Sequence, residues 1–545
     1  MSKPIGSTLP ADLAADVQAR LQAWDRSGAT QRLWRRDTSL WTGADEARWL
    51  GWLDVVPRQQ AAFHRLHALR RAAARSNWSH VALLGMGGSS LCPYVLARSF
   101  GWQSGWPRLS VLDSTDPVQI AAFEAALDLE HTLFVVSSKS GSTLEPNILR
   151  DYFLERSGRP ESFIAITDPG SDLERRSRDA GFRDVVHGEP AIGGRFSALS
   201  AFGLVPAALM GLDVELLLAR AEDMMERCGP RVETEVNPGV VLGVAMGAAA
   251  LAGMDKLTIV ASPLIADLGA WLEQLIAEST GKQGKAIIPV DGEDVAGSGA
   301  YGGDRLFVYL RLDPYPDVAQ DAAIEALERS GRAVLRLSLR DRYDIGSQFF
   351  LWEFATAVAG AVLGINPFDQ PDVEASKVET RRLMSEVEAT GKLDPETLPG
   401  PGPELAAALR AHLGLLAPGD YFAIQAYLPM GEGSTAALQR IRHRVRDARR
   451  VATTLGFGPR FLHSTGQAHK GGPNTGVFLQ ITAEAARDLP VPGRGYTFGL
   501  VEAAQARGDY AVLAQRGRRV LRVHLGADLP AQLAALDATT LQALG

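Results

Sequence analysis

Apolar and polar positions follow two different patterns along the chain. In residues 1–75, apolar residues recur at helical spacing between charged ones, as in ADLAADVQARLQAW and RQQAAFHRLHALRRAAAR, and this spacing predicts an all-helical N-terminal segment. From residue 79 onward, short apolar runs are each followed by a glycine- or serine-rich loop and then by a helical pattern. Such alternation predicts α/β structure with doubly wound parallel sheets, in which ligands bind at the carboxyl ends of the strands.

The predicted strands fall into three groups along the chain. Residues 76–212 contain HVALLG, LSVLD, TLFVVS and SFIAIT, and residues 213–392 contain LTIVAS, AIIPV, LFVYLRL and AVLRLSL. A proline- and glycine-rich stretch at 393–403 predicts a linker, after which YFAIQAYLP begins another strand-helix series. We therefore expect a helical segment at 1–75, two doubly wound domains at 76–212 and 213–392, and a C-terminal α/β module at 404–545.

The C-terminal module repeats a short stretch of the second domain. GRAVLR at 331–336 recurs as GRRVLR at 517–522, and each copy follows a strand pattern and a helical pattern. Because the surrounding order of elements also agrees, we interpret the C-terminal module as a partial duplication of the second doubly wound domain.

Composition narrows the class of protein. Charged residues make up 22% of the chain and the net charge is -7, so we expect neither nucleic acid nor a membrane as a partner, and any anion site must be local. The apolar run at 240–253 is too short to span a bilayer, and the N-terminus lacks a signal pattern. Cys92 and Cys228 lack the spacing of a metal site or a disulfide framework. A cytoplasmic protein without a bound metal is expected.

The SKSGST loop at 138–143 lies between a buried strand and a helix whose first turn contains Glu145. Free N–H groups at a helix start, together with several hydroxyl donors, predict a phosphate pocket. The alternative is that Ser142 or Thr143 only caps the helix, an interaction worth about 1 kcal/mol. Five donors in six positions exceed what a cap requires.

Two glycine-rich turns precede possible ligand contacts. The GMGGSS turn at 85–90 follows a strand, and its glycines allow close approach to the main chain. Ser90 stands where a dinucleotide fingerprint has Gly or Ala, which leaves nicotinamide binding only a weak alternative. In GGRFS, Arg195 follows a glycine pair and is a candidate to stabilise an oxyanion, with a solvated surface arginine as the ordinary alternative.

The AESTGK stretch places Glu278 where a helix runs into a polar glycine turn. A part-shielded carboxylate there suits proton abstraction next to a carbonyl, although a solvated surface glutamate is the common case. His463 follows the strand-like GPRFLH, so we expect it to project at a strand end, whereas His469 is expected to face solvent. NPFDQP predicts a turn before a short helix with Glu374 and Lys377.

Taken in order, SKSGST, GGRFS, ESTGK and NPFDQPDVEASK resemble the motifs of the glucose-6-phosphate isomerase family, whose two sugar isomerase (SIS) domains are doubly wound. The resemblance covers roughly residues 79–377. The whole chain is similar to the isomerase portion of bacterial transaldolase/glucose-6-phosphate isomerase fusions, without the transaldolase part. It implies a glycolytic and gluconeogenic isomerase that interconverts glucose 6-phosphate and fructose 6-phosphate through an enediol, with no cofactor.

The resemblance also implies roles for individual residues. Glu278 matches the catalytic base, Arg195 the arginine near the enediol, and Lys377 the lysine that helps open the sugar ring. The remaining matches are substrate-binding positions in the glycine turn, the serine loop and the helix of the base, namely Gly88, Ser89, Ser138, Ser140, Thr143 and Gln274.

One departure concerns ring opening. The family has a histidine between the base and the lysine, contributed by the neighbouring subunit of a dimer, but that interval contains no histidine here. Our hypothesis is that His463 of the duplicated module replaces it within the same chain, so that either a homodimer or a monomer is possible. An isomerase of another phosphosugar and a non-catalytic sugar-phosphate-binding SIS regulator remain the alternative functions.

Overall fold

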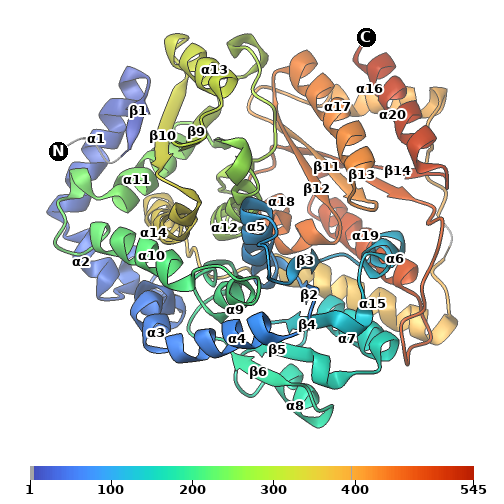
Figure 1. Ribbon diagram of the computed structural model, residues 1–545. Helices are drawn as coiled ribbons and strands as arrows, with labels where there is room; N and C mark the ends of the chain where they lie inside the picture. The colour runs from blue at the N-terminus through green and yellow to red at the C-terminus, as the bar shows by residue number, and fades with distance from the viewer. Residues whose placement is uncertain (1–4, 395) are drawn as a thin grey trace.

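The computed structural model describes residues 5–394 and 396–545, which form three mainly parallel sheets surrounded by helices (Figure 1). The strands are β1 (Gly6–Thr8), β2 (His80–Gly85), β3 (Arg108–Leu112), β4 (Thr132–Ser137), β5 (Phe163–Thr167), β6 (Asp184–His187), β7 (Lys256–Ala261), β8 (Ile288–Val290), β9 (Arg305–Leu312), β10 (Ala333–Leu339), β11 (Tyr421–Tyr427), β12 (Ala452–Phe457), β13 (Gly476–Ala483) and β14 (Arg519–Leu525).

The α-helices are α1 (Ala11–Arg26), α2 (Ala29–Trp34), α3 (Val55–Ala61), α4 (Phe63–Arg75), α5 (Leu91–Phe100), α6 (Pro117–Ala125), α7 (Leu144–Ser157), α8 (Asp172–Asp179), α9 (Ala201–Leu209), α10 (Val214–Arg227), α11 (Pro238–Leu251), α12 (Leu268–Thr280), α13 (Val318–Arg329), α14 (Ile345–Leu363), α15 (Val373–Thr390), α16 (Pro403–Leu413), α17 (Glu432–Arg449), α18 (Gly466–Gly471), α19 (Phe498–Gln515) and α20 (Leu529–Leu544). The predicted α/β class with parallel sheets is confirmed, and each strand predicted for the two doubly wound domains is present.

The first sheet has the order β3-β2-β4-β5-β6, and all its strand pairs are parallel. Strand β6, which has only four residues, was not predicted from the sequence. The chain runs outward from β2 to β3 on one side, and β4 lies on the other side of β2. This reversal of strand order is where open α/β sheets bind ligands, and it brings the loops after β2 and β4 together.

The second sheet has the order β1-β10-β9-β7-β8. Its strands are parallel except for β1, which pairs antiparallel with β10 so that Gly6 lies opposite Arg336. The expectation of an all-helical N-terminal segment is therefore wrong at β1, since three residues are too few to show a strand period. The rest of the segment is helical, with α1 packed against α11 and α4 against α9.

The third sheet, β12-β11-β13-β14, repeats the order of β8-β7-β9-β10. Its strand pairs are all parallel. The two hexapeptides of the repeat also enter equivalent strands, because β10 begins at Ala333 and β14 at Arg519, the third residue of each copy. On these grounds we propose that the C-terminal module is a partial duplication of the second domain.

Helix α15 joins the first sheet to the C-terminal module. It packs along α19, and its residues Leu383, Met384 and Val387 belong to the same buried cluster as side chains of β4 and α19. The linker expected at 393–403 follows it, with residue 395 outside the described residues, and ends where α16 begins. Figure 1 shows α15 in yellow beneath α19, beside the first sheet.

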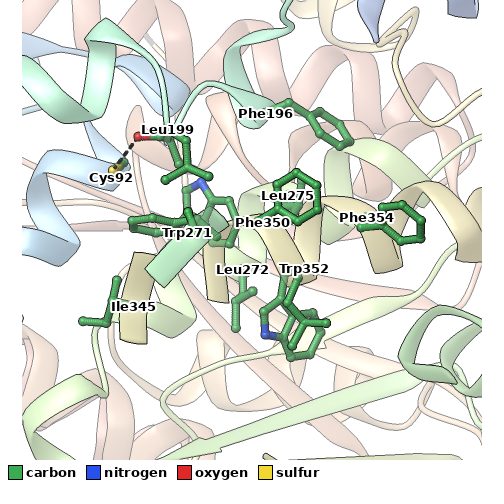
Figure 2. Packing of buried hydrophobic residues seen from close by; sticks show 14 of the residues in the cluster. Cys92, Phe196, Leu199, Trp271, Leu272, Leu275, Ile345, Phe350, Trp352 and Phe354 are labelled. Atoms are coloured by element: carbon green, nitrogen blue, oxygen red, sulfur yellow. Dashed lines mark hydrogen bonds between the residues drawn. The ribbon is translucent and has the colours of Figure 1, made fainter. Parts of the chain in front are cut away.

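The main hydrophobic core surrounds α14. The segment Arg342–Leu363 is long and apolar enough to cross a membrane, but 89% of its 18-residue apolar window is buried inside the molecule, which marks it as a core helix. Figure 2 shows buried side chains of both helices in this core, among them Trp271 and Leu275 of α12 and Phe350 of α14. Because these apolar positions of α12 recur at spacings of three and four, the helix is anchored along one face, which fixes the direction of its other face.

Candidate active site

One edge of α12 carries the predicted base. Gln274 and Glu278 are four residues apart and therefore neighbours on one face of the helix. The Nε2 atom of Gln274 donates to Oε2 of Glu278 at 3.0 Å. The side chain of Glu278 is 12% exposed, so it is neither a solvated surface glutamate nor sealed in the core. A carboxylate in this position can meet a substrate.

Arg195 is buried beside this carboxylate, with Nη1 at 3.3 Å from Oε1 of Glu278. Its other partners hold the guanidinium in one orientation, and they are Ser279 Oγ, Gln370 Oε1, Pro367 O and Asp369 O, at 2.7–2.9 Å. Burial lowers the pKa of Arg195, while the charges of Glu278 and Asp369 oppose that shift. The arginine is thus a fixed positive charge at the base, and the surface alternative is excluded.

The lysine of ESTGK has a structural place in the same cluster. The Nζ atom of Lys282 donates to Asn366 O at 2.6 Å and lies 2.8 Å from Asp369 Oδ1. Burial, reinforced by the charge of Arg195, lowers the pKa of Lys282 to about 7. Lys282 therefore secures the NPFDQP turn, which in turn supplies acceptors to Arg195.

The two glycine turns meet each other beside the middle of α12. A Cβ atom on Gly88 would collide with the main chain of Gly194, and one on Gly87 would lie 2.9 Å from both Gln274 Nε2 and His463 O. Gly87 also has a φ of +54°, a backbone conformation that favours glycine. The glycines of GMGGSS are thus required by contacts between protein segments, and these contacts bring three predicted motifs together.

His463 also lies at this point, although its local structure differs from the prediction. Strand β12 ends at Phe457, and Arg460–His463 forms a 3₁₀ helix, so the strand-like interpretation of GPRFLH is wrong. An apolar run of this length does not distinguish a strand from a buried turn. The carbonyl oxygen of His463 accepts from Nε2 of Gln274 at 2.8 Å. One amide therefore touches both the base and the histidine segment.

Glu145 is a site residue that sequence reasoning missed. It lies in the first turn of α7 and is 4% exposed, and its Oε1 atom lies 3.0 Å from Nε2 of His463. Burial acts to raise its pKa, but the charge and hydrogen bond of His463 and the charge of Lys377 leave the pKa of Glu145 below its ordinary value. The two residues are 318 positions apart, and the sequence offers no signal for the pair.

His463, Glu145, Lys377, Ser140 and Thr143 all line one cavity of about 650 Å³. Lys377 reaches it from α15 with a half-exposed side chain. The predicted phosphate loop and the two ring-opening candidates are therefore in one place. The base cluster adjoins this cavity through the contact of Gln274 with the histidine segment.

The serine loop places hydroxyl groups at the cavity. Thr143 occupies the N-cap position of α7, yet its side chain makes no cap hydrogen bond, so the capping alternative is not supported for it. The hydroxyls of Ser140 and Ser142 are 3.0 Å apart and line the cavity. Not every predicted donor does so, because Lys139 pairs with Asp168. Ser138 is buried, with no hydroxyl partner among the described residues.

His469 does not face solvent, contrary to expectation. It is 5% exposed, its Nδ1 lies 3.2 Å from Nε2 of Gln425, and its ring packs against Tyr421 and Phe478. Burial lowers the pKa of His469 well below the ordinary value, so it is a neutral core histidine. A polar-looking loop misled the prediction, since the third sheet covers it.

The chain is similar to known proteins in both sequence and fold. The family model described as phosphoglucose isomerase matches residues 56–298, a segment that includes Arg195 and Glu278 but ends before Lys377 and His463. A glucose-6-phosphate isomerase of Rubrobacter xylanophilus is 32% identical over 371 residues, 58% of this chain and 84% of that protein.

Two solved structures have a similar fold. A hypothetical protein of Thermus thermophilus matches with a TM-score of 0.60 and 25% identity, covering 70% of this chain and 100% of that one. A glucose-6-phosphate isomerase of Chlamydia trachomatis matches with a TM-score of 0.51 and 21% identity, covering 71% of this chain and 81% of that one.

Proposed function

The chain belongs to the phosphoglucose isomerase family, and we propose that it interconverts glucose 6-phosphate and fructose 6-phosphate through an enediol intermediate. One observation carries the assignment of the site. The amide of Gln274 donates toward the carboxylate of Glu278 at 3.0 Å and toward the carbonyl of His463 at 2.8 Å. The candidate base and the candidate ring-opening histidine are thereby adjacent, as a single sugar would require.

In this proposal, His463 and Lys377 open the sugar ring. Because Nε2 of His463 is hydrogen-bonded to Glu145, Nδ1 is the ring nitrogen available to exchange a proton with the sugar. His463 and Lys377 would move one proton to the ring oxygen and take one from the anomeric hydroxyl, which breaks the ring C–O bond. Glu145 keeps the imidazole oriented during this exchange.

Isomerisation falls to Glu278. In the open aldose, Glu278 would take the proton from C2 and return it to C1 of the enediol, which yields the ketose without change in overall redox state. Arg195, fixed by its four neighbours, offsets the negative charge that grows on oxygen. Phosphate held at Ser140 and Thr143 positions the reacting carbons, and its binding energy lowers the activation barrier of the reaction.

We also propose that His463 acts in the chain that carries Glu278. Its contacts with Gln274 and Glu145 are made within one chain, which favours a site complete in each molecule, whether the protein is a monomer or a homodimer. A cytoplasmic location is part of the same proposal, because both cysteines are free and buried.

The other functions are less well supported. A sugar-phosphate sensor needs the serine loop, but a buried arginine held against a carboxylate has no use in binding alone. An isomerase of another phosphosugar differs only in which hydroxyls are recognised, so a panel of hexose 6-phosphates measures the preference directly.

A coupled assay with fructose 6-phosphate tests the proposal. Purified protein should form glucose 6-phosphate, and Glu278→Gln should abolish most of that activity, whereas Glu325→Gln on the surface of α13 should not. Absence of turnover in the wild-type protein, or full activity of Glu278→Gln, would refute the assignment.

A further inference from the structure

Gln505 connects the C-terminal module to the histidine-glutamate pair. It lies on α19, is 3% exposed, and donates through Nε2 to Oε1 of Glu145 at 2.7 Å. Its own Oε1 accepts from the hydroxyl of Thr115 at 2.8 Å. An ionised carboxylate can only accept hydrogen bonds, so the amide nitrogen must face Glu145. Both ends of the Gln505 side chain are therefore fixed by the first domain.

Two donors meet on one carboxylate oxygen of Glu145. One is Nε2 of His463 at 3.0 Å and the other is Nε2 of Gln505 at 2.7 Å. A neutral donor stabilises the charged form of a carboxylate and restricts its rotamer. The orientation of the imidazole then depends on a carboxylate that Gln505 holds in place, although Gln505 is not one of the groups assigned to proton transfer.

We propose that Gln505 is a positioning residue for the ring-opening step, acting through Glu145 on His463. This inference rests on the proposed function. It makes α19 a part of the catalytic unit, since the C-terminal module then supplies both the histidine and the group that fixes its partner. A merely structural Gln505 would instead stabilise the contact between α19 and the first domain without affecting the protonation of Glu145.

The pH dependence of kcat/KM separates the two roles. In Gln505→Leu, Glu145 loses a donor, so protonation of its carboxylate becomes easier. We expect kcat/KM on fructose 6-phosphate to fall about tenfold. The acidic limb of its pH profile, where kcat/KM falls at low pH, should move up by about 1 pH unit. Gln505→Glu should behave differently. A protonated carboxyl at 505 donates as the amide does, so activity should persist at low pH and be lost as pH rises and two carboxylates face each other.

Gln480→Leu is the matched control. Gln480 is a buried glutamine of β13. Its amide donates to the carbonyl oxygen of Ala506, the residue that follows Gln505, at 3.0 Å, and it does not contact Glu145. Its loss should lower the melting temperature without moving the acidic limb. If Gln505→Leu is too unstable to assay, Thr115→Val reports the same orientation with a smaller limb shift.

An open-chain substrate completes the test. 5-Deoxyfructose 6-phosphate has no 5-hydroxyl and cannot close a ring, so Gln505→Leu should turn it over at the wild-type rate. An unshifted acidic limb, or equal losses on both substrates, overturns the positioning role and leaves the isomerase assignment intact. A wild-type protein that turns over neither substrate overturns the isomerase assignment, and the positioning role with it.

Discussion

The two halves of the candidate site are built in different ways. The base side, Glu278 with Arg195, is assembled from segments of the first two domains, and its arginine is pinned by side chains and carbonyls around it. The ring-opening side combines Glu145 of α7, Lys377 of α15 and His463 of the C-terminal module. The contact of the histidine carbonyl with Gln274 joins them.

The groups proposed for proton transfer at carbon and those proposed for ring opening therefore have separate structural supports. The base side depends on the packing of α12 against α14, whereas the ring-opening side depends on how the C-terminal module docks on the first sheet. Mutations should therefore divide into two classes, which a cyclic and an open-chain substrate can distinguish.

The largest effect is expected for Glu278→Gln. Removal of a positioned base should lower kcat by ~10²–10⁴-fold, and the loss should be equal for fructose 6-phosphate and 5-deoxyfructose 6-phosphate, because both need proton abstraction at carbon. Steady-state assays with the two substrates give the ratio. A loss restricted to the cyclic substrate would contradict the assignment of Glu278 to the base side.

His463→Ala should lower kcat on fructose 6-phosphate by ~10²-fold, the lower range for a general acid-base group. Turnover of the open-chain substrate should stay near the wild-type value, since no ring has to be opened. Glu145→Gln should give the same selectivity with a smaller loss. Equal losses on both substrates would place His463 on the base side and would contradict the division of the site into a base side and a ring-opening side.

The base side was more predictable than the ring-opening side for a physical reason. Glu278 and Gln274 are one helical turn apart, so their proximity follows from local periodicity. The Glu145–His463 pair arises from the docking of two distant segments, which no local pattern encodes. His463 was found through the repeat, but its partner in the first turn of α7 resembled an ordinary helix-terminal acid.

The fold shows the same division. Apolar runs predicted most strands of the three sheets, although not β12, and the repeated hexapeptide indicated equivalent strands. The short strands β1 and β6 were missed, because three or four residues carry too little pattern. The position of α15 also could not be predicted. Its contact with α19 joins two different domains, and no local pattern encodes such a contact.

A smaller effect is expected at the serine loop, which serves both halves by holding the substrate. Ser140→Ala and Thr143→Val should each raise KM about tenfold, the loss of a hydrogen bond to a charged group, on both substrates alike. Ser138→Ala is the control, because its hydroxyl is buried away from the cavity, and its KM should be unchanged. A rise in KM for Ser138→Ala would instead show that this hydroxyl reaches the phosphate.

The smallest effect on activity is expected at Glu273, which precedes Gln274 on α12 and accepts from Oγ of Ser464 at 3.1 Å. This contact also links the two halves, but it lies outside the cavity that contains His463. Burial, reinforced by the charge of Asp291, raises the pKa of Glu273 to about 7 from an ordinary value of 4.5. The folded protein therefore holds this proton more tightly than the unfolded chain does.

Stability should consequently fall as pH rises from about 4.5 through about 7, because the folded state binds more protons over that window. Glu273→Gln removes this dependence and keeps an acceptor for Ser464. At pH 8 its melting temperature should exceed that of the wild-type protein by about 2 °C, and at pH 4.5 the difference should vanish. Its kcat should stay within about threefold of wild type, since the glutamine makes no catalytic contact.

Glu404→Gln, at an exposed position of α16, is the control for both readouts. A large loss of activity in Glu273→Gln would show that the halves are coupled through Ser464 as well as through Gln274, and would merge the two classes of mutation.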